Sequence, residues 1–242
     1  MVINVHGGHN RIVPGASGYL DEVTEDRAVT AQVIAKLRAL GHTVYDCTDD
    51  SGRTQGQNLA NIVHACNAHA ADLDVSIHLN SGGGTGTEVL VYSDTGEAAG
   101  YAVKICAAIS ELGYRNRGVK ERKALYVLRR TTAPALLVEC CFVDSAADAQ
   151  RFDADKMAAA IVRGITGQTA AQTGAAPAQQ TGYHVRITAS VLNVRRDHSA
   201  SSAVATQVRR GEVYTIVAEY NNGGTMWGKL KSGAGWIALN YT

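Results

Sequence analysis

The chain lacks the features of a disulfide-stapled, secreted or membrane-spanning protein. Its five cysteines are an odd number, and none has C-x-x-C spacing. They lie in apolar runs, which predicts buried thiols that form neither disulfides nor metal sites. No apolar stretch is long enough to span a membrane, and residues 1–5 lack the parts of a secretory signal. We therefore expect the chain to fold in a reducing cytoplasm without a signal peptide.

Strong net charge is also absent, because the 242 residues carry only +1 in total. This balance does not favour nucleic acid as a partner. The charge is uneven, however. After Tyr183 there are seven basic and three acidic residues, a net charge of +4, which leaves −3 on the rest. A basic C-terminal part suggests contact with something anionic, although solubility alone also explains it.

One segment has almost nothing to bury. Residues 167–182 are small or polar and include no large apolar side chain. Such a composition predicts a flexible linker. It separates a domain at residues 1–166 from a smaller one at residues 183–242, and both sizes are credible for folded domains.

The first domain alternates short apolar runs with helical periodicity. Buried strands that alternate with helices predict an α/β fold with a mostly parallel sheet flanked by helices. The runs predict strands at residues 2–5, 43–47, 74–79, 87–92 and 135–143. The periodicity predicts helices from about residue 24 to 40 and at 59–66, 102–112 and 155–165.

The C-terminal domain has a different pattern. Short β-type runs occupy residues 191–194, 213–217, 227–230 and 235–239. Residues 221–224 and 232–235 have the glycine-rich chemistry of hairpin turns. This pattern predicts a small all-β barrel.

Three candidate functional residues lie near the predicted carboxyl ends of strands, where open α/β sheets build their sites. His9 follows the first strand, His78 ends the strand at 74–79, and Glu139 interrupts an apolar strand. A buried carboxylate requires a cation or hydrogen bonds to compensate it. We therefore interpret Glu139 as a functional residue, and the alternative is that it forms a structural ion pair.

Glu22 is a second unusual carboxylate. It lies seven residues before Val29, on the buried face of the first predicted helix, although Glu25 and Asp26 share that face. A carboxylate in a first helical turn is also explained by the helix dipole. Position alone therefore leaves the choice between these acids open.

Two histidines and one carboxylate suffice for a catalytic Zn²⁺ with water as its fourth ligand, and a further carboxylate could take a proton from that water. No H-E-x-x-H motif is present. His6 competes with His9 for a place at the end of the first strand. The remaining histidines of the first domain and His198 are better explained as structural or solvated.

Four blocks of residues surround these candidates. They are, in order, Gly8-His9-Asn10, Gly15-Ala16-Ser17-Gly18 leading to Glu22, Asp74-Val75-Ser76-Ile77-His78-Leu79-Asn80, and Pro134-Ala135-Leu136-Leu137-Val138-Glu139. Through these blocks residues 1–166 resemble the zinc-dependent N-acetylmuramoyl-L-alanine amidases of autolysins and phage endolysins. The resemblance implies that His9, Glu22 and His78 bind Zn²⁺ and that Glu139 is the catalytic carboxylate. It also implies the bond cleaved, the amide between N-acetylmuramic acid and L-alanine of the peptidoglycan stem peptide.

The C-terminal domain contains three short motifs, Leu192-Asn193-Val194-Arg195, Gly211-Glu212 and Trp227-Gly228-Lys229-Leu230. Through these motifs it resembles bacterial SH3-type domains, which commonly hold wall enzymes on peptidoglycan. The resemblance implies that both domains contact peptidoglycan. We expect no nucleic acid, membrane or obligate protein partner.

Two other functions fit the same residues. One is a zinc peptidase that cuts within stem peptides, and the other is a non-catalytic wall-binding protein. Without an export signal, we expect the protein to reach the bacterial cell wall after release, by phage lysis or by lysis of a mother cell.

Overall fold

The computed structural model describes residues 1–168, 183–200, 202–222 and 225–242. The chain divides into two compact units, Met1–Gly174 and Ala175–Thr242. The predicted linker at residues 167–182 lies, apart from its first two residues, outside the described part of the chain.

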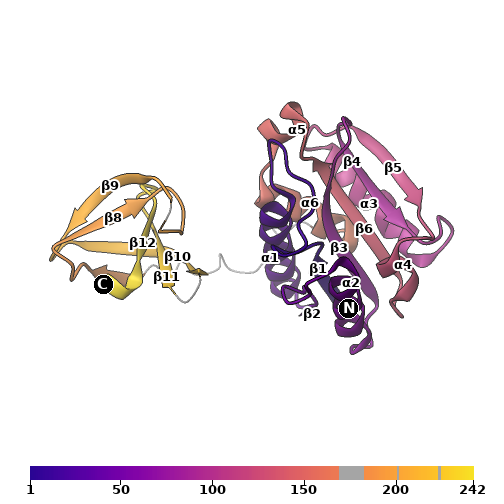
Figure 1. Ribbon diagram of the computed structural model, residues 1–242, viewed down its shortest axis with the longest axis horizontal. Helices are drawn as coiled ribbons and strands as arrows, with labels where there is room; N and C mark the ends of the chain where they lie inside the picture. The colour runs from indigo at the N-terminus through magenta and orange to yellow at the C-terminus, as the bar shows by residue number, and fades with distance from the viewer. Residues whose placement is uncertain (169–182, 201, 223–224) are drawn as a thin grey trace. The chain divides into compact units, whose positions relative to one another are not determined.

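The first unit is built on a six-stranded sheet in the order β2-β1-β3-β6-β4-β5 (Figure 1). Neighbouring strands are parallel except β4 and β6, which pair antiparallel. The predicted α/β architecture is confirmed, and the sheet is mixed. The strands are β1 (Val2–Gly7), β2 (Thr43–Asp46), β3 (Leu73–Asn80), β4 (Thr87–Val91), β5 (Asn116–Glu121) and β6 (Ala135–Phe142).

Helices cover both faces of this sheet. Side chains of α1, α3 and α6 pack in one core with the sheet, and side chains of α2 and α4 pack in a second core on the other face. Within the described residues, no helix is long and apolar enough to cross a membrane. The helices are α1 (Glu22–Ala39), α2 (Gln55–Asn67), α3 (Glu97–Ser110), α4 (Tyr126–Arg130), α5 (Ala146–Arg151) and α6 (Ala154–Thr166).

Strand alternation sorts the apolar and the reactive side chains onto different faces. Val75 and Ile77 of β3 and Val138 of β6 belong to the core beneath α1, α3 and α6. Because successive strand residues point to opposite faces, His78 and Glu139 project toward the face of α2 and α4. All five cysteines are buried and free, as predicted.

Helix α1 begins earlier than its periodicity predicts. The predicted start near Thr24 was wrong by two residues, because Asp21 caps the helix and accepts a hydrogen bond from the Thr24 amide at 3.0 Å. Capping by aspartate satisfies an amide that has no partner within the helix. Glu22 is therefore the first helical residue, and it is only 3% exposed.

A buried acid at the start of β3 makes stability depend on pH. Asn4 donates a hydrogen bond to Asp74 at 2.6 Å, and burial raises the pKa of Asp74 to about 6. The unfolded chain releases this proton near pH 4, so the folded state binds more protons between pH 4 and 6. The free energy of unfolding therefore falls as pH rises through that window.

We expect Asp74→Asn to raise the free energy of unfolding at pH 7.5 by up to about 3 kcal/mol, and to have a smaller effect at pH 4. The amide keeps the bond from Asn4 and removes the buried charge. Urea unfolding at both pH values measures this. Asp72→Asn, at an exposed neighbour, is the control, and an equal gain from it would contradict the explanation.

The second unit is a curled antiparallel sheet in the order β7-β10-β11-β12-β8-β9. Its core includes Val194, Ile216 and Ile237, and Trp227 is buried. The predicted strands are all present, and two more, β7 and β9, complete the sheet. The strands are β7 (Tyr183–Arg186), β8 (Val191–Arg195), β9 (Val204–Arg209), β10 (Val213–Asn222), β11 (Thr225–Leu230) and β12 (Trp236–Ala238).

Candidate metal centre and active site

Three side chains from separate parts of the sequence meet at the carboxyl ends of β1 and β3. His9, Glu22 and His78 each offer a ligand atom, and these atoms lie within 4.8 Å of one another. Glu22 lies between the imidazoles. Its Oε1 is 3.0 Å from His78 Nδ1, and its Oε2 is 3.8 Å from His9 Nε2. Two imidazoles and a carboxylate are the donor set of many catalytic zinc sites.

His9 reaches the cluster through a strained turn. Among the described residues it is the one non-glycine residue with positive φ, at 34°. Such a backbone conformation persists only where surrounding contacts hold it. Gly8 precedes it because a Cβ there would overlap the imidazole of His78. The side chain of Asn10 closes the turn by accepting hydrogen bonds from the amides of Ile12 and Val13.

Arg27 of α1 stabilises this turn through hydrogen bonds to its backbone. Its guanidinium donates to the carbonyl oxygens of Gly8 at 2.8 Å and of His9 at 2.6 Å. It also forms ion pairs at 2.8 Å with buried Asp26 and exposed Asp50. The planar fork of arginine suits several fixed acceptors at once. Arg27 therefore fixes the backbone that carries His9.

Hydrogen bonds fix the position of the Glu22 carboxylate. Besides His78, its carboxylate accepts hydrogen bonds from the amides of Ala16 at 2.8 Å and Leu79 at 3.1 Å. Burial raises the pKa of Glu22, but the bonds from His78 and Ala16 outweigh burial and lower it. A Cβ at Gly15 would collide with this carboxylate, so the loop before α1 requires glycine there.

The two histidines differ in electrostatic setting. Burial, together with the charge of His78, lowers the pKa of His9, which favours the neutral imidazole that binds metals. Burial also acts to lower the pKa of His78, but the hydrogen bond to Glu22 and nearby carboxylates outweigh burial and raise it. The carboxylate of Glu22 thus stabilises a proton on the His78 imidazole.

Glu139 lies beside the cluster without joining it. It is the register partner of His78 across β3 and β6. Its Oε2 is buried and has no hydrogen-bond partner among the described residues, and burial raises its pKa to about 7. A buried, unpartnered carboxylate oxygen marks a group that is kept for a ligand or a reaction. The neighbouring Glu88 is instead paired with Arg117 at 2.7 Å.

His6, the other candidate at this end of β1, is outside the cluster. It is 1% exposed, and its Nδ1 lies 3.2 Å from the Gly7 carbonyl oxygen and 3.5 Å from Ser76 Oγ. Burial lowers its pKa to about 4, so the ring stays neutral. The structure places His9, and not His6, with Glu22 and His78.

A cavity of about 250 Å³ opens on these residues. His9, His78 and Glu139 line one part of it. Its other walls are largely apolar and come from α2, α4 and the sheet. They include Leu59, Ile62, Leu90, Leu125, Val127 and Leu137. A small apolar cavity with a few convergent polar groups is the usual form of an enzyme site.

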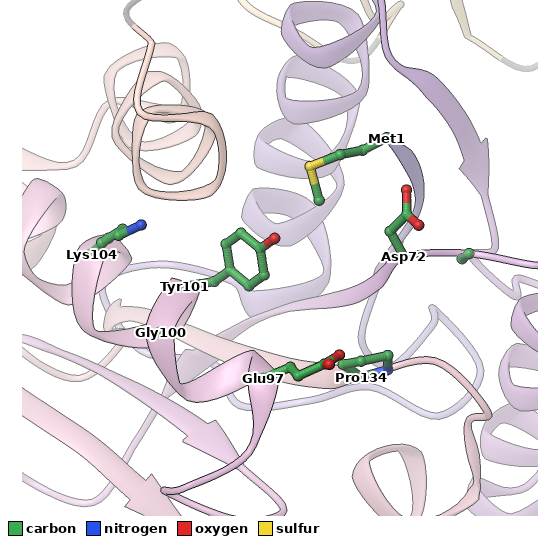
Figure 2. A pocket seen from close by; sticks show the side chains of 8 residues that line it. Met1, Asp72, Glu97, Gly100, Tyr101, Lys104 and Pro134 are labelled. Atoms are coloured by element: carbon green, nitrogen blue, oxygen red, sulfur yellow. The ribbon is translucent and has the colours of Figure 1, made fainter.

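A larger and more open cavity, of about 780 Å³, lies at the amino ends of the strands (Figure 2). Met1, Asp72 and Pro134 each directly precede a strand there, and Tyr101 and Lys104 of α3 lie opposite. No histidine lines this cavity. Reactive groups therefore converge at the other end of the sheet, as expected for an open α/β fold.

Comparison with known proteins identifies the family of the first unit. Residues 1–167 match the family model described as N-acetylmuramoyl-L-alanine amidase (Amidase_3). The chain belongs to this family. The catalytic domain of the CD27L endolysin targeting Clostridia difficile superposes with a TM-score of 0.64 at 27% identity, over 70% of this chain and 98% of that domain.

Curated relatives of this amidase-family chain extend the comparison. A sporulation-specific N-acetylmuramoyl-L-alanine amidase of Bacillus subtilis is 31% identical over 84% of this chain and 80% of its own length. An uncharacterized protein of Clostridium perfringens is 38% identical over 61% of this chain. The chain spans only 45% of that relative's length.

Two residues of the site were not singled out from the sequence. Arg27 reads as an ordinary charged residue of an amphipathic helix, and its partners lie 18 and 19 residues earlier in the chain. Asn10 is part of the block Gly8-His9-Asn10, but the sequence assigns it no role of its own. An asparagine in a loop commonly accepts hydrogen bonds from amides two or three residues later, and this is the sequence signal for a structural support of the turn.

Proposed function

We propose that this protein is a zinc-dependent amidase that hydrolyses the bond between N-acetylmuramic acid and L-alanine in peptidoglycan. One observation carries the proposal. His9, Glu22 and His78 bring their ligand atoms within 4.8 Å beside a cavity that also contains Glu139. Membership of the amidase family supplies the substrate class.

The side chains present fit a zinc ion. Glu22 is buried between two imidazoles, and a buried carboxylate is stabilised by a cation. We infer that His9, Glu22 and His78 hold Zn²⁺. When bound, zinc polarises the amide carbonyl and acidifies water at this position. The turn at His9 and the hydrogen bonds to Glu22 orient two of the three ligands before any metal arrives.

Glu139 is the proposed general base and acid. Its raised pKa of about 7 suits it to accept a proton from the attacking water at neutral pH. The water oxygen bonds to the carbonyl carbon of the lactyl group, and the bond to the alanine nitrogen breaks. Glu139 then delivers the proton to that nitrogen, which leaves as the free amino group of L-alanine.

The proposed hold of Arg27 on the metal site is testable. Arg27→Lys keeps the charge but cannot reach both carbonyl oxygens and both aspartates, so we expect zinc affinity to fall about tenfold. Competition with a chromophoric chelator measures this affinity. Arg38→Lys is the matched control, because Arg38 lies on the same helix and donates its hydrogen bonds to the Val44 carbonyl. Equal zinc affinities in the two variants would refute the role of Arg27.

The C-terminal residues 183–242 form the proposed wall-binding domain. The curled antiparallel sheet and the net charge of +4 support an SH3-type barrel that contacts peptidoglycan. In this proposal residues 1–166 form the catalytic domain and residues 167–182 the linker. The enzyme folds in the cytoplasm, consistent with five free cysteines, and acts on the wall after cell lysis.

Product analysis on purified cell walls tests this function. The wild-type enzyme should generate free amino groups on alanine, and a zinc chelator should abolish them. New amino termini on other stem residues would instead identify a peptidase. Binding to walls without any products, or zinc-free protein after dialysis against zinc, would support a non-catalytic wall-binding protein.

A further inference from the structure

The C-terminal unit has a cavity of its own, of about 480 Å³. Buried Leu192, Trp227 and Ala238 line it. Val191 and Tyr241, which are 52% and 48% exposed, also line it. A hollow that keeps large apolar side chains in contact with water has the character of a binding site.

The polar lining of this cavity is cationic and amide-rich. Asn193, Arg195 and Asn240 contribute to it, and neither aspartate nor glutamate does. Arg195 is half-buried, and its Nη1 donates one hydrogen bond, at 2.6 Å, to the Ser202 carbonyl. It forms no ion pair with the described residues. Because a guanidinium has five N–H donors, Arg195 retains donors for a ligand.

We propose that this cavity binds the carboxylate end of a short peptide. Arginine binds carboxylates through two parallel hydrogen bonds, and the absence of acidic lining residues removes the repulsion that such a ligand would meet. The amides of Asn193 and Asn240 suit peptide groups, and the surface formed by Leu192 and Trp227 suits a small apolar side chain. The surplus positive charge of residues 183–242 favours the same ligand.

In the cell wall this ligand is the free C-terminal end of a stem peptide. This assignment rests on the proposed peptidoglycan substrate, and it names the part of peptidoglycan that the C-terminal domain recognises. The catalytic site acts at the opposite end of the stem, where L-alanine joins the sugar. Binding of the C-terminal end at Arg195 would therefore not cover the scissile amide.

The tryptophans provide a direct readout. The chain has two, Trp227 and Trp236, and both lie in the C-terminal unit. Tryptophan fluorescence of the full-length chain therefore reports on this unit alone. The probe is the peptide diacetyl-Lys-D-Ala-D-Ala, compared with the same peptide amidated at its C-terminus. We expect saturable binding of the acid, and at least about tenfold weaker binding of the amide.

Two variants locate the interaction. Arg195→Gln should weaken binding of the acid by about tenfold, and Arg195→Lys should retain part of the wild-type affinity. Arg196→Gln is the matched control, because it removes the same charge from an exposed residue that does not line the cavity. Its affinity should stay within about twofold of wild type.

Three results would overturn the inference: equal affinity for acid and amide, wild-type affinity in Arg195→Gln, or a response only to N-acetylglucosamine oligomers. The comparison of the acid with the amide uses the wild-type chain, so it tests the inference even if a variant fails to fold. Alanine release from walls without any peptide response would refute this inference alone. Peptide binding through Arg195 without alanine release would refute the proposed amidase activity alone.

Discussion

Glu139→Gln should lower the rate of alanine release from cell walls by about 10²- to 10⁴-fold, the range measured for loss of a general acid–base group. The glutamine side chain has nearly the same shape but cannot carry the proton between water and the leaving nitrogen. Glu139 is not among the three clustered ligands, so zinc content should stay at the wild-type level. Alanine amino groups and bound zinc are measured on the same preparations.

The matched control is Glu88→Gln, on the strand next to Glu139. Glu88 is the register partner of Glu139 across β4 and β6, and it is also buried. Its carboxylate is already bound by Arg117 and Asn80, so it has no free oxygen for proton transfer. We expect Glu88→Gln to retain most activity. A loss as large as that of Glu139→Gln would show that buried charge, and not proton transfer, limits the reaction.

His9→Ala should weaken zinc binding by more than about 100-fold and abolish activity, because loss of a ligand exceeds the 10- to 100-fold effect of losing a supporting group. The measurement is zinc content after dialysis against a weak chelator, together with the zinc dissociation constant from competition. High zinc concentrations should restore only part of the activity.

His6→Ala separates the two histidines of the first strand end. His6 lines the same cavity as His9, but its ring contacts Gly7 and Ser76 and lies outside the ligand cluster. The variant should keep zinc affinity within about tenfold of wild type, although loss of a buried ring lowers stability. If His6→Ala lost zinc and His9→Ala kept it, the assignment of ligands would be reversed.

Much of the fold was predictable because buried strands and amphipathic helices leave periodic patterns. The strands β1, β2, β3, β4 and β6 and the helices α1 and α6 were all predicted within about two residues of their observed bounds. The helices α2 and α3 were also predicted, but they begin four and five residues earlier than their apolar positions indicate. The strand β5 was not predicted, because Asn116–Glu121 is a polar edge strand without an apolar run. The strand β9 was missed for the same reason, since its residues are exposed apart from Val208.

The site could be predicted only as a set of candidates. The sequence placed His9, His78 and Glu139 near strand ends, because strand boundaries are local. It could not decide between His6 and His9, or between Glu22 and the neighbouring acids Glu25 and Asp26. In the structure Asp26 binds Arg27, while Glu22 turns toward the histidines. Burial and contacts between distant segments made these distinctions, and neither is encoded in local spacing.

Local patterns alone determined the α/β class, the all-β character of the C-terminal residues and the three strand-end candidates, because each depends on residues close in the chain. The tertiary structure decided which side chains share one centre. Glu22 meets His78 across 56 residues of chain, and the strained turn at His9 is held by an arginine 18 residues away. Such contacts exist only once the sheet and α1 have packed together, since packing is what brings these groups out of water and into contact.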